Sequence, residues 1–224
     1  MAGKLIVIEG LDGSGKSTQI ELLKKKFEKE GINYSYIHFP RLNNGLYGEL
    51  IAEFLRGEYG SVKEVHPKLV ALLFANDRTE HLEEINRWLN NGFIILCDRY
   101  VNSNIAFQCA KIENVAEKEK LKKWILNFEF NCNKLPVPYK SFFLDVPFNF
   151  ISKSLSNQRA GADREYLAGK RDIHEESLSL QENVYQEYKK LLSEQDDFIA
   201  IPCYNQNNEM LKPKLINELI INNL

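Results

Sequence analysis

The sequence predicts a doubly wound α/β fold, in which helices cover both faces of a parallel β-sheet. Short apolar runs rich in β-branched and aromatic residues recur along the chain, and helical segments separate them. Their near-continuous apolar character is typical of strands that are buried on both faces, as in a parallel sheet between helices. The predicted strands span residues 4–9, 34–39, 93–98, 141–146 and 198–202.

The clearest helical pattern follows the first strand. Residues 18–30 carry Ile20, Leu23 and Phe27 at helical spacing, and Gly31 is a typical residue to end the helix. A strand followed directly by a helix is the repeating unit of the doubly wound fold.

Length and composition indicate one globular domain over residues 1–224, because 224 residues with 44% hydrophobic side chains suffice for one core. The formal net charge of −2 gives no indication of a nucleic-acid partner. No apolar run reaches membrane-spanning length, and the four cysteines have neither metal-ligand nor redox spacing. We therefore expect a cytoplasmic protein with reduced thiols and no membrane partner.

One segment, at about 152–171, interrupts the alternation of strands and helices. It lacks a strand-like run and holds two glycines together with Arg159, Arg164, Lys170 and Arg171. A solvated basic loop is one interpretation. The other is a small mobile lid that closes over an anionic ligand.

A phosphate-binding loop lies between the first strand and the first helix. The sequence there matches G-x-x-x-x-G-K-[ST], in which backbone N–H groups surround a phosphate chain and the lysine reaches the β- and γ-phosphates. The serine hydroxyl is a ligand for Mg²⁺, and the helix N-terminus favours the anion. The predicted ATP-binding residues are Gly10, Asp12, Gly13, Ser14, Gly15, Lys16, Ser17 and Thr18.

Two further motifs indicate where an acceptor binds. Phe74 and Arg78 are at positions i and i+4 of a predicted helix and share one face. Asp98-Arg99-Tyr100 ends the third strand, at the edge where open α/β sheets bind ligands. If the segment after it is helical, Ser103, Asn104 and Phe107 point into the same cleft.

Together with residues 9–12 (EGLD) and 39–41 (FPR), these motifs resemble the thymidylate kinase family. The resemblance extends from residue 4 to about residue 188. It implies a P-loop NTPase-type sheet of five parallel strands, dimerisation through helices, and transfer of the γ-phosphoryl group of ATP to dTMP. The expected small-molecule substrates are ATP and dTMP, the cofactor is Mg²⁺, and the protein is expected to be a homodimer.

The resemblance assigns roles at the base end of the acceptor. It implies that Phe74 stacks on the thymine ring and that Arg78 donates a hydrogen bond to thymine O4. Asn104, with Ser103 beside it, reads the base edge. Phe107 lies beside C2′ of the sugar and excludes ribonucleotides. Alternatively, Phe74 is a core aromatic residue and Phe107 only packs its helix onto the sheet.

It also assigns the sugar and phosphate contacts. Asp12 holds the 3′-hydroxyl and helps to organise the Mg²⁺ shell, while Phe39, followed by Pro40, packs under the sugar. Arg99 clamps the acceptor phosphate, with Arg41 nearby; a structural ion pair is the alternative for Arg99. Asp98 either assists Ser17 at the metal or fixes Arg99.

The chain departs from the family pattern at two positions. One subgroup carries a basic residue where this chain has Gly13, so the cation that meets the transferred phosphoryl group should come from the lid, with Arg159 and Arg164 as catalytic candidates beside Lys16. Many members carry a tyrosine where this chain has His174, which we expect to be solvated.

Two other functions are compatible with a phosphate loop. A deoxynucleoside kinase would typically carry Glu-Arg-Ser at the end of the third strand, where this chain has Asp-Arg-Tyr. A non-catalytic P-loop regulator would need an Asn/Thr-Lys-x-Asp motif to read guanine, and the sequence has none. Both differences favour the thymidylate kinase interpretation.

Overall fold

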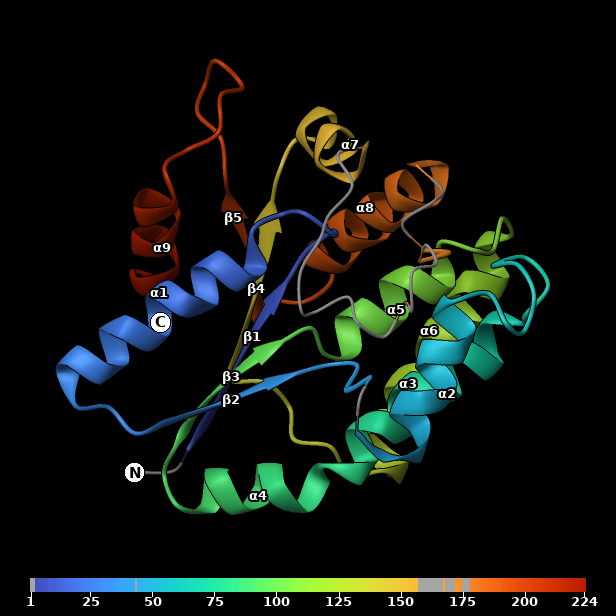
Figure 1. The fold of residues 1–224 in the computed structure, drawn as a ribbon, viewed down its shortest axis with the longest axis horizontal. Helices are drawn as coiled ribbons and strands as arrows, with labels where there is room; N and C mark the ends of the chain where they lie inside the picture. Colours follow the sequence, from blue (N-terminus) through green and yellow to red (C-terminus); the bar gives the residue numbers. More distant parts are fainter. Residues whose placement is uncertain (1–2, 43, 157–166, 168–171, 175–177) are drawn as a thin grey trace.

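The computed structural model describes residues 3–42, 44–156, 167, 172–174 and 178–224, with the side chains of 153–156 excepted. Five parallel strands form one sheet in the order β2-β3-β1-β4-β5 (Figure 1). This confirms the predicted fold class. The strands are β1 (Lys4–Glu9), β2 (Tyr34–His38), β3 (Ile94–Asp98), β4 (Lys140–Asp145) and β5 (Phe198–Pro202).

Helices cover both faces of this sheet (Figure 1). Helices α1 and α9 pack together on one face, and α5 and α8 pack together on the other. The helices are α1 (Lys16–Glu30), α2 (Gly45–Leu55), α3 (Pro67–Glu80), α4 (Leu82–Asn90), α5 (Val101–Cys109), α6 (Val115–Leu126), the π-helix η1 (Asn127–Cys132), α7 (Phe148–Ser156), α8 (Leu178–Leu192) and α9 (Pro213–Ile221).

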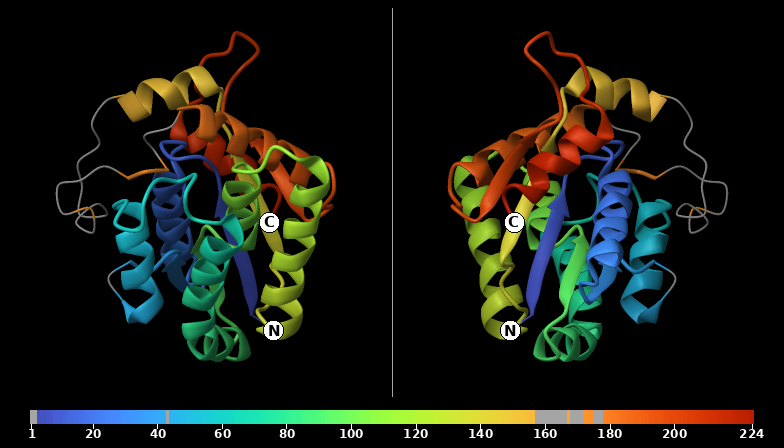
Figure 2. Two further views of the ribbon diagram at one scale, coloured as in Figure 1. Left: turned by 90° about the vertical axis from the view of Figure 1, so that its right-hand side faces the viewer. Right: turned by 90° about the vertical axis from the view of Figure 1, so that its left-hand side faces the viewer.

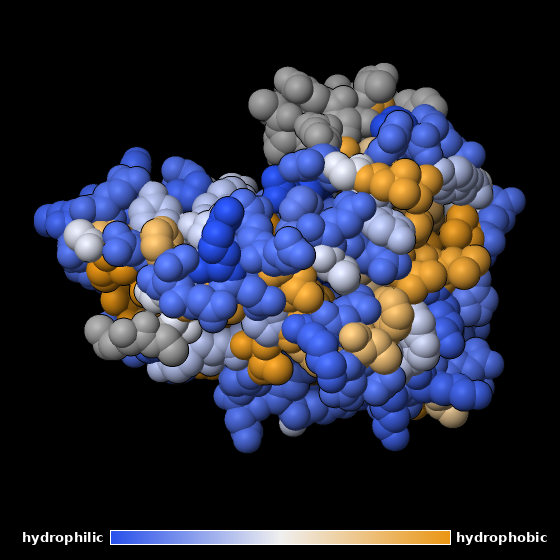
Figure 3. Space-filling model, turned by 90° about the horizontal axis from the view of Figure 1, so that it is seen from below, coloured by the Kyte–Doolittle hydropathy of each residue, from blue (hydrophilic) through white to orange (hydrophobic). Residues whose placement is uncertain are grey.

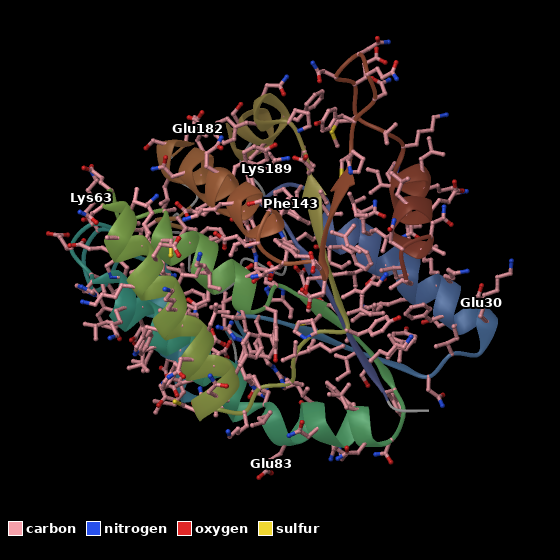
Figure 4. The ribbon with its side chains drawn as sticks, turned by 180° about the vertical axis from the view of Figure 1, so that it is seen from behind. Glu30, Lys63, Glu83, Phe143, Glu182 and Lys189 are labelled. Carbon is pink, nitrogen blue, oxygen red and sulfur yellow. The ribbon has the colours of Figure 1, made fainter. Side chains whose placement is uncertain are left out.

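The central strand is β1, which is hydrogen-bonded to β3 on one side and β4 on the other. Its residues 5–9 are all buried, as the continuous apolar run predicts. On β4, Phe143 lies between the sheet and α8 (Figure 4), and its ring stacks on Tyr188 of α8 at a centroid distance of 4.8 Å. This packing fixes α8 against the carboxyl half of the sheet.

Parallel pairing brings the ends of β1, β2 and β3 to one edge. The phosphate loop follows β1, the 39–41 segment follows β2, and Arg99 follows β3. Strands β4 and β5 point toward the end of the molecule at which α7 lies (Figures 1 and 2). The candidate site residues therefore meet at the carboxyl edge, as expected for an open α/β sheet.

Predicted and observed boundaries differ by one or two residues. Helix α1 begins at Lys16, inside the phosphate loop, rather than at residue 18. Strand β2 ends at His38, although the N–H of Phe39 still donates to Asp98 O at 3.0 Å. The proposed lid segment at 152–171 begins within α7, which continues to Ser156, and the rest of it is described only at residue 167.

The structure bears on the expectations about membrane spans and about cysteines. In the described part of the chain, no helix is long and apolar enough to cross a membrane. The four cysteines are all free thiols, and only Cys132 is exposed. The division into a single domain with a lid stays a prediction.

Candidate active site

A cavity of about 330 Å³ lies at the carboxyl edge of the sheet. Its walls come from the phosphate loop, the segments after β2 and β3, the inner faces of α3 and α5, and residues 172–174. Almost all predicted acceptor residues line it: Asp12, Phe39, Pro40, Phe74, Arg78, Arg99, Ser103, Asn104 and Phe107. Ser17 and Asp98, the predicted metal residues, line the same cavity.

The phosphate loop is built by glycines in conformations that other residues rarely adopt. Gly10, Gly13 and Gly15 have φ of 153°, 81° and 89°. At Gly10 there is also no room for a side chain, because a Cβ would lie 2.6 Å from the Ser14 hydroxyl. The ammonium of Lys16 folds back over the loop and donates to the carbonyls of Gly10 and Leu11, at 3.3 and 3.0 Å. The loop thus holds its cation in place.

Asp12 and Arg99 connect the phosphate loop to the end of β3. The Nη2 of Arg99 donates to Asp12 Oδ1 at 2.7 Å, and its Nη1 to Ser103 Oγ at 3.3 Å. Burial alone would lower the pKa of Arg99, but the carboxylate of Asp12 raises it well above its ordinary value. The guanidinium therefore stays charged beside the cavity and keeps further N–H groups for an anionic acceptor. Asp12, not Asp98, is the acid hydrogen-bonded to Arg99.

Glu9, at the end of β1, organises the start of α5. Its carboxylate accepts from the backbone N–H groups of Tyr100 and Ser103, at 2.9 and 3.2 Å, and from the hydroxyls of Ser103 and Tyr188. Burial raises the pKa of Glu9, and these hydrogen bonds offset only part of the effect. Ser103 is consequently used inside the protein, whereas Asn104 keeps a buried Oδ1 that has no hydrogen-bond partner among the described residues.

Phe74 and Arg78 lie on the same face of α3, as their spacing predicts. Phe74 packs partly against the cluster of Ile51 and Phe54 and also lines the cavity, so both interpretations of it describe part of its environment. Arg78 is only 2% exposed and lies over the rings of Phe39 and Tyr100 at 5.9 Å. Its charge requires a buried partner.

That partner is Glu129, which no motif of the sequence identifies. It lies in η1, is 0% exposed, and accepts from Nε and Nη2 of Arg78 at 2.6 Å each. It also accepts from Nδ2 of Asn104 at 2.8 Å. The signal in the sequence was a lone acid between Phe128 and Phe130, since a charge within an apolar run usually has a buried partner.

One side of the cavity is aromatic. Phe107 stacks on the ring of His174 at 5.2 Å and 28°, and the guanidinium of Arg99 lies 5.2 Å above the Phe107 ring. The expectation that His174 is solvated is wrong, because it is 5% exposed and also contacts Phe54 edge-on at 5.4 Å. Burial, aided by the charge of Lys111, lowers its pKa well below the ordinary value, so the imidazole is neutral.

Asp98 and Ser17 provide oxygen atoms next to the phosphate loop. Burial tends to raise the pKa of Asp98, but the hydrogen bond from His38, at 3.3 Å, and the charges of Lys16 and Arg99 leave it below its ordinary value. Asp98 is therefore ionised. Its Oδ1 is buried and has no hydrogen-bond partner among the described residues.

Arg41 is the one predicted acceptor residue that the structure does not bring to the cavity wall. Its Nη1 contacts Nδ1 of His81 at 2.8 Å and Oε2 of Glu84 at 3.3 Å. Its backbone N–H donates to Asp77. Arg159 and Arg164, the predicted lid cations, lie outside the described residues, and their roles stay predictions.

These features define the class of the protein. A glycine loop with a buried lysine lies at one end of the cavity, and an arginine, an amide and an aromatic ring suited to a nucleobase lie at the other. The chain is therefore a nucleotide-dependent phosphotransferase of the P-loop class.

Comparison with known proteins narrows the class. The family model for thymidylate kinase matches residues 8–212, and the chain belongs to this family. A thymidylate kinase of Plasmodium falciparum is 30% identical over 192 residues, which are 86% of this chain and 79% of that protein. A thymidylate kinase of Mycobacterium tuberculosis is 32% identical over 192 residues, which are 85% of this chain and 86% of that protein. The solved thymidylate kinase structure from Candida albicans covers 99% of this chain and 92% of its own, with a TM-score of 0.70 and 26% identity.

Proposed function

We propose that this chain phosphorylates dTMP to dTDP by direct transfer of the γ-phosphoryl group of ATP. Membership of the thymidylate kinase family and the relatives of that name support the reaction. The observation that carries the proposal for this chain is that one cavity runs from Asp12 and Ser17, at the phosphate loop, to Phe74, Arg78 and Asn104.

The arrangement suits a transfer in which the protein aligns two anions. Lys16 neutralises the β- and γ-phosphates of ATP, and Arg99 holds the acceptor phosphate at the opposite side of the loop. Asp12, hydrogen-bonded to Arg99, links the position of the two groups. Alignment and charge stabilisation are the main contributions that a kinase makes to phosphoryl transfer.

Mg²⁺ is part of the proposal because the residues present suit it. The ionised Asp98 has a buried oxygen without a hydrogen-bond partner among the residues the structure describes, and the Ser17 hydroxyl lines the same cavity. Hard oxygen donors are the ligands that Mg²⁺ prefers. Ser17 would hold the ion directly and Asp98 would support it, and the bound ion would neutralise phosphate charge during transfer.

The remaining cation is assigned to the lid. Gly13 leaves the phosphate loop without an extra basic residue, so Arg159 or Arg164 would meet the charge on the transferred phosphoryl group. Their loss should then lower kcat more than substrate affinity. This assignment rests on the sequence alone.

A homodimer in the cytoplasm completes the proposal. Apolar side chains gather on the side of the molecule where α2, α3 and α6 lie (Figure 3). Leu46 of α2 and Leu69 of α3 are 63% and 59% exposed there, which supports pairing of two chains through these helices. Light scattering during gel filtration should give twice the chain mass.

The test is a coupled ADP-release assay with a panel of dTMP, dUMP, dCMP, dAMP, dGMP and thymidine, with and without EDTA. dTMP should give the highest kcat/KM, and EDTA should abolish turnover. Preference for thymidine over dTMP would instead assign a deoxynucleoside kinase. The absence of turnover with every acceptor, for a folded protein with Mg²⁺, would refute the proposal.

A further inference from the structure

The base end of the cavity depends on one buried carboxylate. Glu129 is wholly buried in η1 and accepts three hydrogen bonds, two from Arg78 and one from Asn104. Glu129 does not line the cavity itself. Any influence that it has on a bound nucleotide is therefore exerted through the two residues that do.

The hydrogen bonds of Asn104 fix which way its amide faces. Nδ2 donates to Ala71 O at 3.0 Å and to Glu129 Oε1 at 2.8 Å. Both partner atoms are acceptors, so the atom that contacts them must be the amide nitrogen. Its two N–H groups are thereby used. Oδ1 is buried and without a partner among the described residues, so Asn104 can offer a ligand only an acceptor.

The hydrogen bonds of Arg78 leave it with a donor, where those of Asn104 leave an acceptor. Burial would lower its pKa, but the Glu129 carboxylate raises it, so the guanidinium stays charged. Glu129 uses Nε and Nη2, and no hydrogen bond from Nη1 is found within the described part of the chain. Arg78 therefore presents a donor next to the acceptor of Asn104.

We propose that Glu129 is a positioning residue that sets the hydrogen-bonding polarity of the base site, with an acceptor at Asn104 beside a donor at Arg78. The complementary ligand edge is a ring N–H next to a carbonyl, as in thymine and uracil. Cytosine presents a ring nitrogen acceptor and an amino group at the corresponding positions. It would oppose acceptor to acceptor at Asn104 and donor to donor at Arg78.

The inference rests on the proposed function, because it assigns the base specificity of that site. Its critical substitution is Glu129→Gln, which keeps the shape but replaces one acceptor oxygen by a donor NH₂. Whichever way the new amide at position 129 faces, its NH₂ opposes an N–H of Asn104 or of Arg78, so one of these two residues loses its hydrogen bond. The loss releases either the fixed acceptor of Asn104 or the fixed donor of Arg78, and with it the preference for a ring N–H beside a carbonyl.

The measurement is kcat/KM for dTMP and for dCMP, with KM for ATP as an internal reference. In E129Q the ratio of dTMP to dCMP should fall by about 5- to 150-fold, the effect of one mismatched buried hydrogen bond. KM for ATP should change little, because the ATP side of the cavity is not touched. Calorimetric binding of dTMP and dCMP should show the same change in ratio.

Asn133→Ala is the matched control. The Nδ2 of Asn133 donates to Thr79 Oγ1 at 2.7 Å, so this variant removes a hydrogen bond between α3 and the segment after η1 without changing Arg78 or Asn104. It should leave the dTMP to dCMP ratio as in wild type. If E129Q lowers kcat/KM equally for dTMP and dCMP and so keeps their ratio, Glu129 is only structural and the inference is overturned.

The same measurement separates failure of the proposed function from failure of the role of Glu129. If wild type phosphorylates no nucleotide, the proposed function fails, whereas an unchanged ratio with active wild type refutes only the role of Glu129. If E129Q is not recovered folded, Glu129→Asp is measured instead, because its shorter side chain withdraws both oxygens from Asn104 and Arg78. The dTMP to dCMP ratio should fall in E129D, and an unchanged ratio in the folded variant would overturn the inference.

Discussion

Asp77 is a buried carboxylate whose charge should lower the stability of the protein at neutral pH. It lies on α3, is 0% exposed, and its Oδ2 accepts from the backbone N–H of Arg41 at 3.1 Å. Through this bond it holds the 39–41 segment, part of which lines the cavity. The perturbation is Asp77→Asn, which keeps one acceptor oxygen for Arg41 and removes the charge.

The magnitude follows from the pKa. Burial raises the pKa of Asp77 from 3.8 to about 6, with the N–H of Arg41 and the charge of Arg78 opposing the effect and Glu80 adding to it. The shift of about 2.2 units at 1.36 kcal/mol per unit corresponds to about 3 kcal/mol. Between pH 3.8 and about 6 the folded state binds more protons than the unfolded state, so stability falls as pH rises. Below pH 3.8 both states are protonated and the cost vanishes.

The assay is urea unfolding of wild type and Asp77→Asn between pH 4 and pH 8. The variant should approach wild-type stability at pH 4 and exceed it by about 3 kcal/mol at pH 8. Glu83→Gln, which removes an exposed carboxylate of α4, is the control and should show no such pH-dependent gain. A constant difference between Asp77→Asn and wild type over the whole range would refute the reasoning.

Three further predictions concern the site itself. Lys16→Ala should abolish transfer while the protein stays folded; near wild-type ADP release would refute the P-loop assignment. Arg78→Ala should raise the activation free energy for dTMP, calculated from kcat/KM, by about 1–3 kcal/mol. It should also lower the free energy of unfolding by about 3–5 kcal/mol, because Glu129 is left unpaired. Kinetics and urea unfolding measure the two effects, and unchanged values contradict them. Phe107→Ala should reduce discrimination between dTMP and its 2′-hydroxy analogue, since a phenyl ring cannot pair with a buried hydroxyl; an equal loss for both substrates would make Phe107 a packing residue.

The sheet and the phosphate loop were predictable because local patterns determine them. A run such as residues 4–9 is buried by its own composition, and the glycines of the loop are required by its backbone conformation. The positions of Phe74, Arg78 and Asn104 were predictable as well, since helical spacing gives each residue a face.

Partners distant in the sequence were not predictable in the same way. Glu129 is 51 residues from Arg78, and nothing in either segment identifies the other. His174 follows a charged segment, which suggests a solvated residue, but the contact with Phe107 buries it. The family resemblance predicts Arg41 near the acceptor phosphate, yet its side chain turns to His81 and Glu84. Tertiary packing decides such cases, and one sequence alone does not record it.

The backbone at Arg99 has a consequence for protein engineering. Arg99 has φ of 65°, a left-handed conformation that costs a residue with a side chain on the order of 1–2 kcal/mol. A thermostabilisation protocol that scans for such residues would choose glycine at this position, because glycine adopts a positive φ without a Cβ penalty. The same substitution deletes the guanidinium that faces Asp12. A criterion based on the backbone alone would therefore break a partly buried ion pair, and position 99 should be excluded from any stabilising library.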